Sequence, residues 1–61
     1  MDIDEIIEYK NVLEDKHLNI EDKITELEKE NKKEEIEYFE NELNSISEKI
    51  NLIDSILEEY I

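Results

Sequence analysis

The chain lacks the residues that most often interrupt, bend or crosslink small folds. Its 61 residues include no Gly, no Pro, no Cys and no Trp. Without cysteine there is no disulfide and no thiolate metal site, and a single histidine leaves no zinc site. A small β-fold needs several tight turns, for which glycine and proline are missing, whereas long helices need neither residue. These absences predict an all-α fold in one helical domain that spans residues 1–61.

Positive charge is also scarce, because 20 acidic residues stand against seven lysines and the formal net charge is −13. Such a surface repels phosphate backbones and anionic headgroups, so direct binding to nucleic acid or a membrane is not expected. The chain shows neither a signal peptide nor an apolar run of membrane-spanning length, which predicts a cytoplasmic protein. A chain this short buries little core alone, so we expect it to assemble with itself, with another protein, or with both.

The strongest pattern is a seam of apolar and aromatic residues in the second half, alternately three and four residues apart. These are the a and d positions of a heptad repeat, which line one side of a helix. Such a stripe needs a facing helix, either from the same chain or from a partner. The predicted interface residues are Ile36, Phe39, Leu43, Ile46, Ile50, Ile53, Leu57 and Tyr60, the last expected in the core.

The first half repeats this pattern less regularly. Lys10 and His17 occupy a positions, and the histidine predicts a seam-edge side chain whose protonation makes assembly sensitive to pH. Asp2 is the predicted N-cap, with Glu5 three residues later as in a capping box. The a and d positions of this half are Ile3, Ile6, Lys10, Leu13, His17, Ile20, Ile24 and Leu27.

The two stripes require a chain reversal if they are to face each other. At about 100° per residue, Leu27 and Ile36 would lie on opposite sides of one continuous helix. Lysines cluster between them, and Asn31 suits a left-handed helix cap. The predicted fold is therefore an antiparallel hairpin, with helices over about residues 2–28 and 35–60 and a connection over about 29–34.

An alternative break lies at residues 16–19. There Lys16 and His17 would end one helix and Asn19 would N-cap the next. This alternative gives a short helix followed by one long helix.

The seam residues also bear on the assembly. Leu43 and Leu57 occupy a positions while Ile46 and Ile53 occupy d positions, an arrangement that favours more than two strands. We therefore expect a coiled-coil-like homo-oligomer, a four-helix bundle of two hairpins.

Candidate chemistry is limited to carboxylates and one histidine. Glu14 and His17 have the spacing of a helical carboxylate and histidine metal motif, but a single match among so many acids is weak. No pocket is expected to shift a carboxylate pKa, and no nucleophile elbow or phosphate-binding loop is present. We predict no catalytic, cofactor-binding or metal-binding residues, and interpret the densest acidic cluster as a solvated surface: Glu34, Glu35, Glu37, Glu40 and Glu42.

One segment resembles a known family. Residues 53–60, with the sequence IDSILEEY, resemble the end of the motif in small sporulation-regulating phosphatases of the stage-zero E type. Ile50 and Asn51 stand where that family has Ser and Gln. The resemblance implies a helical hairpin in which Asp54 acts on the phosphoaspartate of a partner response regulator.

The leading functional hypothesis is a non-enzymatic interaction module, a small acidic helical regulator, adaptor or inhibitor that binds a target protein through the seam. One alternative is a decoy that imitates nucleic acid and blocks a nucleic-acid-binding protein, with Glu37, Glu40 and Glu42 on its charged face. The other alternative is the aspartyl-phosphate phosphatase implied by the resemblance.

Overall fold

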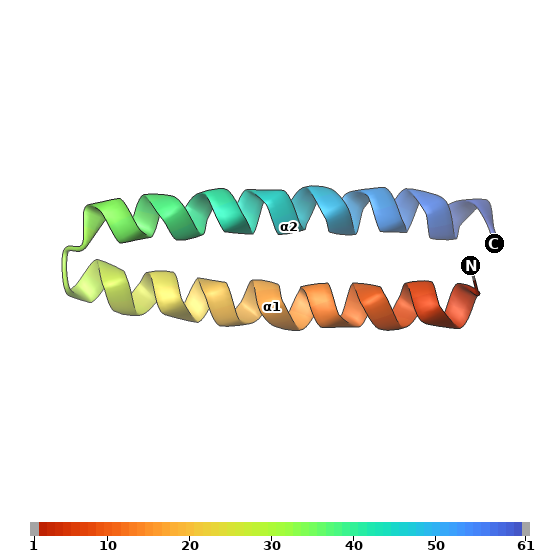
Figure 1. The fold of residues 1–61 in the computed structure, drawn as a ribbon, viewed down its shortest axis with the longest axis horizontal. Helices are drawn as coiled ribbons and strands as arrows, with labels where there is room; N and C mark the ends of the chain where they lie inside the picture. Colours follow the sequence, from red (N-terminus) through yellow and green to blue (C-terminus); the bar gives the residue numbers. More distant parts are fainter. Residues whose placement is uncertain (1, 61) are drawn as a thin grey trace.

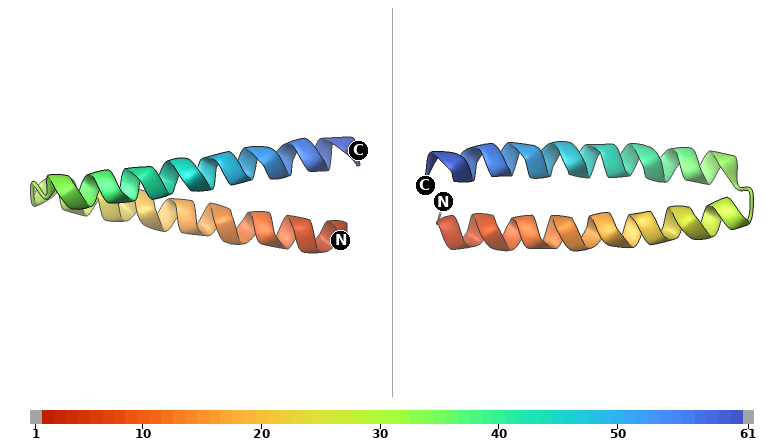
Figure 2. Two further views of the ribbon diagram at one scale, coloured as in Figure 1. Left: turned by 45° about the horizontal axis from the view of Figure 1, so that its top comes forward. Right: turned by 180° about the vertical axis from the view of Figure 1, so that it is seen from behind.

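The protein is a hairpin of two antiparallel helices in a computed structural model that describes residues 2–60 (Figure 1). Helix α1 spans Ile3–Lys29 and helix α2 spans Lys33–Glu59, each with 27 residues. The arms lie side by side along a molecule of 44 × 15 × 14 Å, and the start of α1 and the end of α2 lie at the end opposite the turn (Figure 2). The predicted all-α helical hairpin is confirmed.

The reversal lies where the two stripes required it, and the alternative break at residues 16–19 is wrong. Helix α1 is continuous through His17. Its seam is intact on both sides of that residue, because Leu13 and Ile20 are both buried against α2. Packing on both sides therefore keeps the segment helical. The connection is shorter than predicted, with α1 ending at Lys29 and α2 beginning at Lys33.

The turn is closed by backbone hydrogen bonds and needs no glycine. Asn31 adopts a left-handed conformation with φ of 58°, which asparagine tolerates better than most residues. The Asn31 N–H donates to the Glu28 carbonyl at 3.2 Å, and the Lys32 N–H donates to the Leu27 carbonyl at 3.2 Å. This pair of bonds is the Schellman motif, which satisfies carbonyls at the helix end. The cap predicted at Asn31 is confirmed.

The start of α1 differs from the prediction in one respect. Asp2 occupies the N-cap position in an extended conformation, and its carbonyl accepts the Ile6 N–H at 3.2 Å. Its side chain makes no capping hydrogen bond, so the predicted capping box with Glu5 is wrong. Asp4 and Glu5 lie in the first turn, where the helix dipole attracts carboxylates that remain in water.

The core is a single layer between the two seams. Because each helix covers only one side of the other, no large side chain among residues 2–60 is less than 2% exposed. Within the same residues, neither helix has an apolar stretch able to cross a membrane. The core cluster consists of Ile6, Leu13, Ile20 and Ile24 from α1 with Ile46 and Ile53 from α2.

Candidate protein-binding face

Helix α1 already covers much of the seam predicted on α2. Ile46 and Ile53 are buried in the core, and the half-buried seam residues Ile36, Phe39, Leu43, Ile50 and Leu57 pack against it. Tyr60 differs from the prediction, because it is 64% exposed and lies outside the core. It is the C-cap residue of α2, at the end of the hairpin where α1 only begins at Ile3, so little of α1 is left to cover it.

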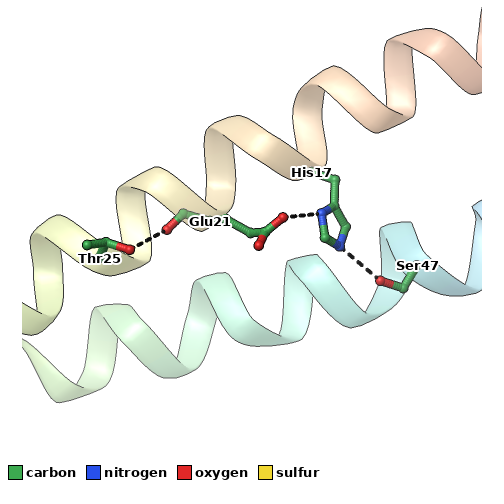
Figure 3. Close-up of polar contacts among 4 residues, drawn as sticks. All are labelled: His17, Glu21, Thr25 and Ser47. Carbon is green, nitrogen blue, oxygen red and sulfur yellow. Dashed lines mark hydrogen bonds and ion pairs between the residues drawn. The ribbon is translucent and has the colours of Figure 1, made fainter.

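The two polar residues of the α1 seam have partners nearby. Lys10 Nζ lies 2.5 Å from Asp54 Oδ1 of α2. His17 Nε2 lies 3.2 Å from Ser47 Oγ of α2, while its Nδ1 lies 2.7 Å from Glu21 Oε1, one turn further along α1 (Figure 3). These contacts explain how a lysine and a histidine occupy seam positions without leaving an unsatisfied buried polar group.

The contacts of His17 are compatible with both protonation states. A neutral ring that donates from Nδ1 to Glu21 accepts the Ser47 hydroxyl hydrogen at Nε2. A protonated ring donates from both nitrogens, and the Ser47 oxygen accepts just as well. The pH sensitivity expected for assembly therefore stays a prediction. For Lys10, the hydrogen bond to Asp54 raises the pKa of the ammonium group, with the charges of Asp54 and Glu14 acting in the same direction.

The cross-helix contacts of Lys10 and His17 show which side of the hairpin each heptad position faces. Both join an a position of α1 to an e position of α2. Around a helix, e lies next to a, whereas g lies next to d. The a and e positions of both helices therefore share one side, which we call the open face, and the g positions lie on the opposite side, the far face. A groove of about 330 Å³ on the open face is lined by Glu14, His17, Leu18, Ser47, Ile50 and Asn51.

An incompletely covered apolar stripe runs along the open face. It consists of the a positions of α2, one every seven residues, and each is half-buried. Leu18 of α1 borders the same groove and is 60% exposed. The hairpin thus leaves part of its own seam in water. The stripe residues are Ile36, Leu43, Ile50 and Leu57.

Carboxylates flank this stripe along both helices. Of those at e positions, Glu21 contacts His17 and Asp54 contacts Lys10. The remaining ones are exposed and have no ion pair within residues 2–60: Glu14 and Glu28 on α1, and Glu40 on α2. The open face therefore carries an apolar stripe, crossed by the contacts of Lys10 with Asp54 and of His17 with Ser47, and it is acidic along its flanks.

The other acidic candidates are not gathered into one site. Glu40 occupies an e position, whereas Glu42 occupies a g position and is half-buried, so they lie on different sides of α2. Glu37 and Glu40 occupy neighbouring b and e positions, so Glu42 alone lies apart, and the decoy alternative stays a prediction. Glu14 and His17 share the groove of the open face. Among residues 2–60, no three His, Cys, Asp or Glu side chains are grouped to hold a metal ion.

The far face also has exposed apolar side chains, mixed with lysines. Val12 is 59% exposed there, close to the value of Leu18 on the open face. This near equality offers a matched pair of positions for mutagenesis. The g and c positions of the far face include Tyr9, Val12, Lys16, Lys23, Tyr38, Lys49, Leu52 and Ile56.

The residue singled out by the phosphatase resemblance is Asp54, which lies on the open face. Its side chain is 45% exposed and its Oδ1 atom contacts the Lys10 ammonium. The activity that the resemblance implies stays a prediction. In comparisons with known proteins, no family model, no curated protein and no solved structure matches this chain.

Proposed function

We propose that the chain is a non-enzymatic protein–protein interaction module, a small acidic helical regulator, adaptor or inhibitor that binds a target protein through its open face. The observation that supports this proposal is the half-buried stripe of Ile36, Leu43, Ile50 and Leu57. Burying apolar surface contributes about 25 cal/mol per Å², so covering the exposed part of four aliphatic side chains favours association.

The shape of the stripe favours a helix as the covering element. Its residues recur every seven positions. A facing helix with a heptad repeat also places one a and one d side chain in every seven residues, so the two periods match. A target helix lying between α1 and α2 would complete the seam from the open side. The four-helix bundle expected from the sequence is one such assembly, in which a second hairpin supplies the covering helices.

Substitution of Leu18 by glutamate, with Val12→Glu as control, tests which face binds. Both side chains are exposed to nearly the same extent, at 60% and 59%, and glutamate is a good helix former. The probe is an amphipathic helical peptide of three heptads with Leu and Ile on one face and neutral polar residues elsewhere, used below its own self-association threshold. Its binding is measured by fluorescence anisotropy, and the solution mass of the protein by light scattering.

We expect the wild-type chain to bind the peptide or to self-associate. Leu18→Glu should weaken that association about tenfold, because a charge replaces an apolar contact, while Val12→Glu should change it less than about twofold. A wild-type chain that stays monomeric and ignores the peptide would contradict the proposal. Equal effects of the two substitutions would show that the open face is not the binding face.

A further inference from the structure

We propose that the partner of the open face is a basic amphipathic helix from another protein, an inference that rests on the function proposed above. Such a helix places aliphatic side chains on the stripe and lysine or arginine side chains along both of its edges.

Carboxylates that make no ion pair with any of residues 2–60 border the stripe on both sides. Glu14 and Glu28 occupy e positions of α1, and Glu40 occupies an e position of α2. A helix that lies along the stripe therefore has two acidic side chains on one flank and one on the other. Cationic side chains at its edges would meet them in water, where opposite charges direct the encounter and set the orientation.

A second copy of this chain is a poor match for the same face. It would bring its own acidic rows against Glu14 and Glu28 and add another net charge of −13. Of the seven lysines only two belong to a or e positions, and one of them, Lys10, is already bound to Asp54. The other, Lys33, lies at the turn end of α2. Lys16, Lys23 and Lys49 occupy g positions on the far face.

The test compares two helical peptides that share one apolar face and differ only in the residues beside it, lysine in one and glutamate in the other. Each is titrated into the full-length chain at low and at physiological ionic strength. We expect the lysine peptide to bind at least tenfold more tightly than the glutamate peptide at physiological salt. Raising the salt should reduce this difference, because the flanking charges are exposed and screened.

A matched pair of triple variants locates the effect. Glu14→Gln, Glu28→Gln and Glu40→Gln together remove the free carboxylates beside the stripe. The control, Glu8→Gln, Asp15→Asn and Asp22→Asn, changes net charge equally at exposed f positions on the back of α1. We expect the first variant to bind the lysine peptide about tenfold more weakly, since each exposed pair contributes modestly, and the control to lose less than about threefold.

Several outcomes would overturn the inference. Equal losses in the two triple variants would mean that the lysine peptide responds to total charge and not to the open face. Equal affinity for the lysine and glutamate peptides would contradict a basic partner. The proposed function would still stand if the neutral peptide bound the wild-type chain and Leu18→Glu weakened that binding. A stable homo-oligomer that is disrupted by Leu18→Glu would identify a second copy as the occupant. Absence of both peptide binding and self-association would contradict the proposed function as well.

Discussion

Replacing Ile46 by alanine tests whether α1 and α2 hold each other through the seam. Ile46 is 3% exposed and belongs to the same core cluster as Leu13 and Ile20. Removing a buried aliphatic side chain costs roughly 2–5 kcal/mol in ordinary cores. We expect about 2–3 kcal/mol here, because a one-layer core with an open side lets neighbours and water fill the space. The free energy of unfolding of a chain this long is of order 3–9 kcal/mol, so this loss is large.

The control is Ile56→Ala, the same substitution on the same helix. Ile56 is 44% exposed, and we expect its replacement to cost about 1 kcal/mol or less because much of its surface is already in water. The higher helix propensity of alanine offsets part of that cost. The difference between the two variants therefore isolates the contribution of contact across the hairpin.

Urea unfolding followed by far-ultraviolet circular dichroism measures both changes. A small protein loses about 1 kcal/mol of stability per M urea, so Ile46→Ala should lower the unfolding midpoint by about 2–3 M and Ile56→Ala by less than about 1 M. The measurements belong at a concentration where light scattering shows a monomer, since assembly adds its own stability. Equal shifts for the two variants, or no shift for Ile46→Ala, would refute the seam packing.

Two further substitutions probe local features. Asn31→Gly should raise the melting temperature by several degrees, because a φ of 58° suits glycine. Asn31→Val should lower the melting temperature by a comparable amount or more. If neither substitution changed the melting temperature, the left-handed cap would be contradicted. The bond to Asp54 raises the pKa of Lys10, so its contribution is present below the ordinary value of 10.5 and lost as pH rises through the raised value. The urea midpoint of Asp54→Asn should therefore fall below that of the wild type near neutral pH, and the gap should close in strong alkali. A gap that persists there would contradict the ion pair.

The helices were predictable because they depend on local properties, whereas the reversal was one of two breaks that the sequence allowed. Residues missing from the composition excluded a turn-rich fold, and the heptad spacing identified which side of each helix is apolar. Leu27 and Ile36 then favoured a turn between them, since one straight helix would place them on opposite sides. The capping box at Asp2 was less predictable, because a water-exposed carboxylate near a helix start is attracted by the dipole without forming a fixed bond.

The partners of Lys10 and His17 were not predictable from local pattern. Both stood out as polar residues at seam positions, and no local pattern indicated what either would contact on the other helix. Their contacts with Asp54 and Ser47 depend on the axial alignment of two helices that are distant in sequence. The same alignment left Tyr60, at the end of α2, 64% exposed.

Periodicity and the missing turn residues identified two apolar stripes and the side of the helix on which each lies, because these properties act within one helix. The place of the reversal was left between two breaks, and the continuous α1 with Leu13 and Ile20 packed against α2 shows which one forms. How much of the seam the chain covers for itself, and which flank is left open with its carboxylates, follows from the packing of the two helices. Two helices enclose only one line of contact, so the surface that stays exposed depends on how they are rotated and aligned against each other.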